Sequence, residues 1–142
     1  MTVHLIKMAV GVTDLDHLRD FQQGRRFDAG GRPAVTGFTR RKPRRPDEVL
    51  DGGSIYWVIK GSVRCRQRIL DLEDAVDGDG KPFCRLVLDP ELVPVLPTAR
   101  KPFQGWRYLE PAAAPADLGG AEPAPGELPP HLLAELRALG LV

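Results

Sequence analysis

The chain has 142 residues, enough for one domain with a core of its own, and its 42% hydrophobic and 27% charged residues are typical of a folded protein. The longest apolar run is far too short to cross a bilayer, and the start of the chain lacks the small-residue cleavage site of a signal peptide. We therefore expect a cytoplasmic protein with no membrane segment. The net charge of +1 combines +4 over residues 1–110 (19 basic, 15 acidic) with −3 over residues 111–142 (1 basic, 4 acidic).

The first forty residues predict a strand, a helix and a second strand. Residues 2–10 alternate loosely and favour a strand that Gly11 ends. Thr13 is the expected N-cap of a helix that ends near residues 24–26. An apolar stripe at helical spacing follows the cap and consists of Leu15, Leu18 and Phe21. Residues 34–39 then predict a short strand.

The segment 40–46, RRKPRRP, is basic and contains no acid. Its two prolines exclude a central strand or a helix interior. We expect an exposed basic connector, hereafter the connector, with five cations: Arg40, Arg41, Lys42, Arg44 and Arg45. Residues 46–50 are expected to form a single helical turn, stopped by the two glycines that follow.

The centre of the chain predicts an antiparallel meander of three strands. Residues 55–61 are rich in β-branched and aromatic residues, residues 63–72 follow a turn at 60–62, and residues 82–90 follow an Asp-Gly turn at 77–80. Residues 103–109 predict one more strand. With no repeated βαβ pattern, the fold class is α+β: a small, mainly antiparallel curled sheet or partly closed barrel with one early helix and one C-terminal helix.

The composition changes after residue 110. Residues 1–110 are expected to form the single α+β domain, and residues 111–128, rich in Ala, Pro and Gly, a linker. Residues 129–140 predict an amphipathic helix with one apolar face, formed by Leu132, Leu133, Leu136 and Leu139. That face packs either on its own domain or on a partner protein, and the sequence leaves both alternatives open.

Three arginines two residues apart, Arg64, Arg66 and Arg68, are expected to share one face of a strand, while the residues between them face the core. Parallel positive charges repel, so such a row needs acids or an anionic ligand. Two interpretations remain: an internally paired, solvated face, or a face that binds phosphate.

Nucleic acid is the anionic ligand that the sequence favours. The connector adds five cations of the kind that follow a phosphate backbone. Tyr56, Trp57 and Trp106 are candidates for stacking on an unpaired base, although core packing is the more common role of such residues in a small domain. This interpretation requires the arginine row and the connector to lie on the same side of the molecule.

The motifs for catalysis and metal binding are largely missing. The two serines lie outside any nucleophile elbow, and no phosphate-binding glycine loop is present. The three histidines are scattered, and Cys65 and Cys84 lack the spacing of a zinc site. We expect both cysteines to be buried free thiols and predict no metal, no cofactor and no catalytic residue.

The segments DGGSIYWVIKG, RQRILDL, LVLDPELV and RKPFQGWRYL together resemble an uncharacterised bacterial family, domain of unknown function 1489. The resemblance covers about residues 3–118 and implies no activity. At the level of fold, the order of strands is similar to the small barrels of the PUA, ASCH and EVE type, many of which bind RNA or modified bases.

The sequence thus favours an RNA-binding module in which Arg64, Arg66, Arg68 and the connector contact phosphate. Two alternatives stay open. One is a protein-interaction module that uses the C-terminal helix, and the other is an enzyme that acts on a nucleotide-like anion. An enzyme is expected to have a concave pocket with a perturbed acid or base beside the arginines.

Overall fold

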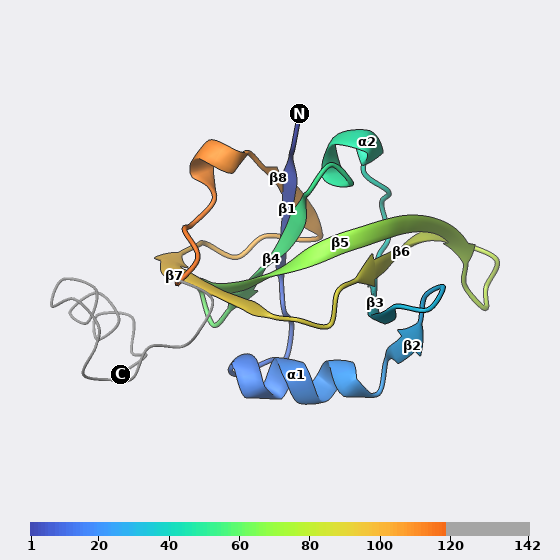
Figure 1. Cartoon of the computed structure of the whole chain (residues 1–142), viewed down its shortest axis with the longest axis horizontal. Helices are drawn as coiled ribbons and strands as arrows, with labels where there is room; N and C mark the ends of the chain where they lie inside the picture. The colour runs from blue at the N-terminus through green and yellow to red at the C-terminus, as the bar shows by residue number, and fades with distance from the viewer. Residues whose placement is uncertain (119–142) are drawn as a thin grey trace, which may run out of the picture.

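The computed structural model describes residues 1–118, which form a curled sheet of eight strands with two α-helices and one short 3-10 helix (Figure 1). The strands are β1 (His4–Met8), β2 (Arg26–Asp28), β3 (Pro33–Thr39), β4 (Ser54–Ile59), β5 (Ser62–Val76), β6 (Pro82–Leu88), β7 (Val93–Ala99) and β8 (Trp106–Leu109). The helices are α1 (Leu15–Gln23), α2 (Pro46–Val49) and η1 (Pro111–Ala113).

The sheet has the order β2-β3-β6-β5-β4-β1-β8, and β7 pairs with β5 beside this path. Of the strand pairs in the described residues, β1–β4 is parallel and the rest are antiparallel. The sheet stays open, because no pairing within residues 1–118 joins the β2–β3 end to β8. The predicted small, mainly antiparallel curled sheet is therefore confirmed.

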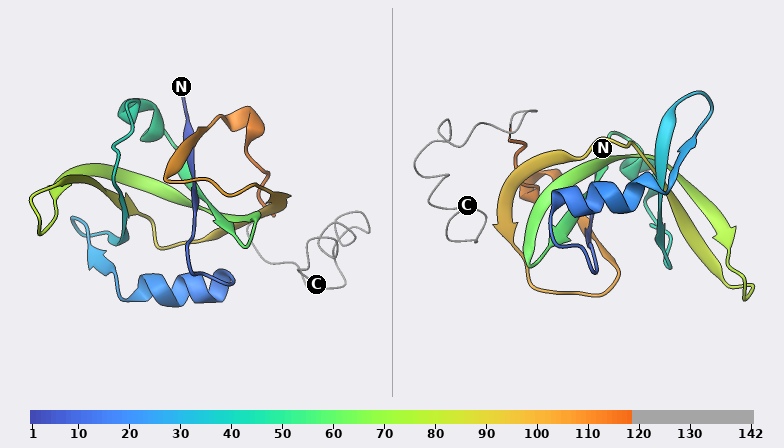
Figure 2. Two further views of the ribbon diagram at one scale, coloured as in Figure 1. Left: turned by 180° about the vertical axis from the view of Figure 1, so that it is seen from behind. Right: turned by 90° about the horizontal axis from the view of Figure 1, so that it is seen from below.

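Strand β5 organises the sheet because it is 15 residues long and pairs with three other strands. Its first half lies between β4 and β7, and its second half pairs with β6. The β5–β6 hairpin extends away from the body of the sheet (Figures 1 and 2). The predicted meander is present as β4, β5 and β6.

Alternation along the strands divides the buried residues into two cores. On β4, Trp57 points into the larger core, which Leu15 and Leu18 of α1 help to fill. The neighbouring Tyr56 points to the other face, into a smaller core with Ile6. Because successive residues of a strand face opposite sides, the two cores mark the two faces of the sheet.

Helix α1 lies in the range where the sequence predicts its early helix. The N-cap is Asp14 rather than Thr13, because the Asp14 carboxylate accepts a hydrogen bond of 2.8 Å from the backbone N–H of His17. The predicted helical turn at 46–50 is present as α2. Gly53 follows it, and a Cβ there would lie 2.2 Å from the Val49 carbonyl oxygen, so only glycine fits this approach.

The first residues of the stretch predicted as a linker, 111–118, contact the domain. The Leu96 N–H donates to Ala116 O over 2.8 Å, and the Leu118 N–H donates to Pro94 O over 3.0 Å. Residues 119–128 of that stretch and the helix predicted over 129–140 lie outside the described residues.

In the described part of the chain, no helix combines the length and apolar character that spanning a membrane requires.

Candidate functional site

The three arginines of β5 have different environments. Arg66 donates to Asp117 from Nε and Nη2, both over 2.7 Å, and from Nη1 to the Ser54 hydroxyl over 3.1 Å. These bonds raise the pKa of Arg66 and lower that of Asp117. Arg66 therefore holds residues 114–118 against the sheet and is not free for a ligand.

Arg64 and Arg68 have no carboxylate within 4.0 Å among residues 1–118. Arg64 lies in a β-bulge, since the register shifts there toward both β4 and β7. Arg68 pairs with Ser54 in a regular part of the ladder and is exposed. The predicted row of three equivalent arginines is thus interrupted by one bulge and one internal ion pair.

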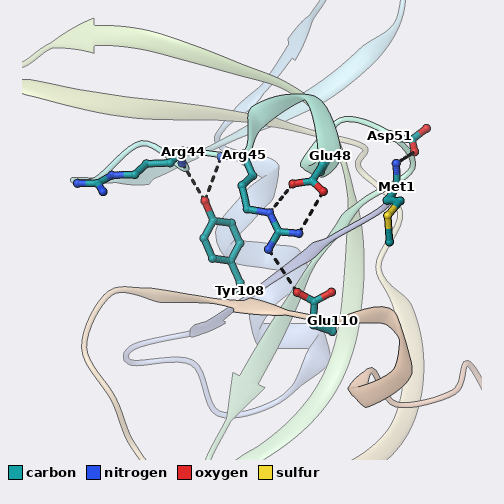
Figure 3. A network of polar contacts seen from close by, with 7 residues as sticks. All are labelled: Met1, Arg44, Arg45, Glu48, Asp51, Tyr108 and Glu110. Carbon is teal, nitrogen blue, oxygen red and sulfur yellow. Dashed lines mark hydrogen bonds and ion pairs between the residues drawn. The ribbon is translucent and has the colours of Figure 1, made fainter.

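The second half of the connector is bound to α2 and β8 (Figure 3). The Tyr108 hydroxyl accepts from the backbone N–H groups of Arg44 and Arg45, over 2.8 and 3.1 Å. The Arg45 guanidinium donates to both carboxylate oxygens of Glu48 and, over 3.3 Å, to Glu110. The bond from Arg45 lowers the pKa of Glu48.

The first half of the connector also finds partners within the domain. Arg40 donates to Asp77 over 3.0 Å, and Lys42 donates to Asp74 over 3.1 Å. The Arg41 guanidinium lies over the Trp106 ring, 4.4 Å from its centroid, and the indole N–H of Trp106 donates to the Arg41 carbonyl over 2.7 Å. The connector is therefore attached to the fold along its length and is not an independent basic loop.

The arginine row and the connector contact opposite faces of the sheet. Arg66 pairs with Tyr56, whose ring lies in the smaller core. The connector contacts Trp106, which lies in the larger core on the other face. The two segments thus do not combine into the single basic surface that the sequence analysis required for its nucleic-acid interpretation.

The three aromatic residues proposed for stacking are packed inside. Tyr56, Trp57 and Trp106 are 4%, 8% and 3% exposed. The Trp57 indole N–H donates to the buried Gln67 side chain over 3.0 Å. Core packing, the alternative interpretation, describes their positions in this structure.

A basic groove lies at the opening of the curled sheet, where β3 approaches β1 and β8. It consists of two adjoining hollows of about 520 and 360 Å³ that share Thr39, Arg40 and Gly105. The charged residues that line it are four cations, Lys7, Arg40, Arg41 and Arg107, and one acid, Asp77. Hydrogen bonds from the Lys81 N–H and from Arg40 lower the pKa of Asp77, so this acid stays ionised at neutral pH.

Aromatic rings at the groove are more exposed than those of the core. Phe38 is 47% exposed and packs edge-on against Phe83, with ring centroids 5.7 Å apart. Both phenylalanines line the larger hollow together with Lys7. The groove thus places an open aromatic face beside positive charge.

Lys7 is the residue of this groove that the sequence analysis did not select. Burial lowers the pKa of its ammonium group, and no carboxylate lies within 4.0 Å of it among residues 1–118. It pairs with Trp106 and Trp57, which both face the larger core. A lysine at an inward position of the first strand was the sequence signal for it.

The described residues hold no group of three or more His, Cys, Asp or Glu side chains that could bind a metal ion. Cys65 and Cys84 are free and fully buried, as predicted, and burial raises the pKa of the Cys65 thiol to about 12. Neither thiol is therefore a nucleophile in the folded domain.

The sequence profile of one family matches residues 5–142. The chain belongs to the family described as protein of unknown function (DUF1489). The match confirms the resemblance and extends it through the C-terminal residues, which the resemblance had left out. No curated protein and no solved structure matches the chain significantly.

Proposed function

We propose that the chain is a binding module for single-stranded nucleic acid, RNA above all, and that the strand lies in the basic groove. The observation that carries the proposal is the composition of the groove, with four cations, one acid and two phenylalanine rings, of which that of Phe38 is exposed. Phosphate contacts supply affinity, and aromatic faces accept unpaired bases without selecting a sequence.

Each side of the groove has a part in this proposal. Lys7 offers an ammonium group that forms no ion pair within 4.0 Å in the described residues, so a phosphate is its natural partner. Arg107 is exposed at the other end of the groove. Phe38 provides the ring on which a base stacks.

The form of the groove favours a polymer over a small molecule. Its two hollows adjoin each other and open to solvent, so neighbouring nucleotides of one strand occupy them in turn. The arginines outside the groove, Arg64 and Arg68, are at most secondary contacts in this proposal. The curled sheet is compatible with the suggested likeness to PUA-type barrels but stays open, and a likeness of fold would in any case fix no function.

The test is the affinity of the full chain for a short mixed-sequence RNA, measured by fluorescence anisotropy at about 50 mM salt. We expect Lys7→Glu to weaken binding about 10-fold or more, because it removes one phosphate contact and adds repulsion. The matched control is Arg68→Glu, the same charge change on the opposite face, with an expected effect within about twofold.

The aromatic contact has its own matched pair. Phe38→Ser is expected to cost about 1–3 kcal/mol of binding free energy, as loss of one base–aromatic stack does. Phe27→Ser removes a ring that is 38% exposed but does not line the groove, and we expect it to leave affinity unchanged.

Two results overturn the proposal. Equal losses for Lys7→Glu and Arg68→Glu place binding outside the groove. No affinity for RNA or DNA at about 50 mM salt, where non-specific contacts register, rejects a nucleic-acid ligand and favours the protein-interaction alternative.

Lys7 also favours a second candidate, an enzyme that acts on a nucleotide-like anion. Its lowered pKa, in a groove with Arg40 and Arg107, meets the requirement for a perturbed base beside arginines. Lys7→Arg distinguishes the two, since a binding role tolerates the retained charge and a proton-transfer role does not.

A further inference from the structure

An apolar notch adjoins the basic groove between α1 and β3. It has a volume of about 160 Å³ and shares Lys7 and Phe38 with the groove. Val10, Phe21 and Phe38 line it and are 87%, 52% and 47% exposed. Three large apolar side chains open to water around one hollow indicate a docking surface.

The charge at the notch is positive. The Arg25 guanidinium lies 4.5 Å from the Phe21 ring centroid and 5.3 Å from that of Phe38, so it bridges the two rings. Arg25 and Lys7 are the charged residues that line the notch, and no acid lines it in the described structure. The notch therefore favours an occupant that is apolar and carries negative charge.

We infer that residues 129–140 of the same chain dock in the notch through their leucines. Leu132, Leu136 and Leu139 have the spacing of one apolar stripe, and Glu135 lies among them. Residues 119–142 hold three glutamates and one arginine, a net charge of −2 that complements Arg25 and Lys7.

The docking segment has the reach that this contact needs. The described chain ends at Leu118, whose backbone N–H donates a hydrogen bond to the carbonyl of Pro94 at the start of β7. The ten residues 119–128 extend over at most about 33 Å. A domain of this size has a radius of gyration of about 13 Å. The tether is longer than twice this radius, so the segment 129–140 is not confined to the surface beside β7, and the notch is the surface that matches its chemistry.

Docking there has a consequence for the groove. Because the notch and the groove share Lys7 and Phe38, the docked leucines and an RNA strand compete for the same two side chains. The C-terminal residues thus act as an intramolecular competitor that raises the concentration of RNA needed for binding. The docking itself does not depend on the proposed RNA binding.

The experiment is disulfide trapping in the full chain. Val10→Cys/Leu136→Cys places one thiol at the notch and one in the leucine stripe. The matched control is Val76→Cys/Leu136→Cys, because Val76 is 65% exposed but lies at the end of β5, outside the notch. Cys65 and Cys84 are fully buried and do not interfere. We expect the notch pair to close into an intramolecular disulfide about 10-fold faster than the control pair.

The contact is tested further by adding Leu132→Asp and Leu139→Asp to the trapping variant, which is expected to lower its rate to that of the control. Equal rates for the two pairs overturn the inference. Disulfide-linked dimers as the main product overturn it too, since they place a second copy in the notch. No step of the trapping uses RNA, so its failure is distinct from that of the proposed function.

Discussion

The connector and the first half of β5 are similar in sequence, since both are short segments dense in arginine. They differ in how many of their cations have carboxylate partners in the folded structure. Three of the five cations of the connector have carboxylate partners: Arg40, Lys42 and Arg45. On β5, Arg66 has such a partner and Arg64 and Arg68 do not within the described residues. The partners of the connector include acids 32, 37 and 65 residues away in sequence.

These partners show that a high density of cations in a sequence does not by itself identify a ligand surface. What matters is which acids the fold brings within reach. The connector contains no acid, but β5, the β5–β6 turn and the residue that follows β8 supply the acids with which it pairs. Conversely, Lys7 is a single lysine in an apolar strand, and the fold places no carboxylate within 4.0 Å of it among residues 1–118, although Asp77 lines the same hollow.

The variant expected to lose the most stability tests the difference between Arg66 and Arg68 on β5. Arg66→Glu removes the bonds to Asp117 and Ser54 and places two carboxylates together, so we expect a loss of about 3 kcal/mol in the free energy of unfolding. Arg68→Glu is expected to change it by no more than about 0.5 kcal/mol, as at other exposed sites. Urea unfolding measures both. Similar losses of unfolding free energy in the two variants would mean that the ion pair of Arg66 with Asp117 does not stabilise the fold more than an exposed arginine does.

The next effect concerns the attachment of the connector. Trp106→Phe keeps the ring in the core but leaves the Arg41 carbonyl without its 2.7 Å donor, and we expect a loss of about 1–2 kcal/mol. Arg41→Ala keeps that bond and loses the cation–π contact, worth about 0.5–1 kcal/mol at an exposed site, together with a long bond of 3.4 Å from Nη2 to the Trp106 carbonyl. If chemical denaturation ranks the two variants in the opposite order, the connector is held by its side chains rather than by its backbone.

A smaller effect separates neighbours within the connector. Arg45→Ala removes the bonds to Glu48 and Glu110, whereas the Arg44 side chain has no bonded partner within residues 1–118 (Figure 3). We expect Arg45→Ala to lower the urea midpoint by more than Arg44→Ala does. The backbone bonds to Tyr108 are common to both variants and cancel in the comparison. Identical urea midpoints would mean that the hydrogen bonds to the Tyr108 hydroxyl, and not the side chain of Arg45, hold this half of the connector.

The smallest effect is a pH dependence. The bond from Arg66 lowers the pKa of Asp117 below its ordinary value of about 3.8. A lowered carboxyl pKa contributes stability that is present above the unfolded value and is lost as the pH falls through the folded value. We therefore expect part of the acid destabilisation below about pH 4 to vanish in Asp117→Asn. A pH–stability profile of the variant parallel to that of the wild type would exclude this contribution.

The sequence predicts the meander of the fold because its signals are local. β-Branched runs and an Asp-Gly turn specify β4, β5 and β6 without reference to the rest of the chain. It misses β2, which has three residues, and β7, whose two prolines argue against a strand. The prolines are tolerated because Pro97 falls where the β5–β7 register shifts, and because Pro94 accepts a bond from the Leu118 N–H through its carbonyl and needs no N–H of its own there.

The candidate site is less accessible to sequence reasoning because it joins distant elements. Lys7, Phe38 and Arg107 come from β1, β3 and β8, and no spacing rule connects them. The three arginines of β5 do not form one continuous row of free cations, for a related reason. Alternation on a strand says which residues share a face, but the bulge at Arg64 and the acid at Asp117 are set by strands and segments outside β5.

The pairing of β1 with β8 has a consequence for the synthesis of the chain. His4 pairs with Leu109, a separation of 105 residues, so β1 is synthesised long before its partner β8. Until β8 leaves the ribosome, one edge of β1 stays unsatisfied, and unpaired edges of this kind promote aggregation. Contacts this distant in sequence also slow folding. A chaperone that covers the nascent β1, or a change in the speed at which β8 is synthesised, is therefore expected to affect the yield of folded protein more than its final stability.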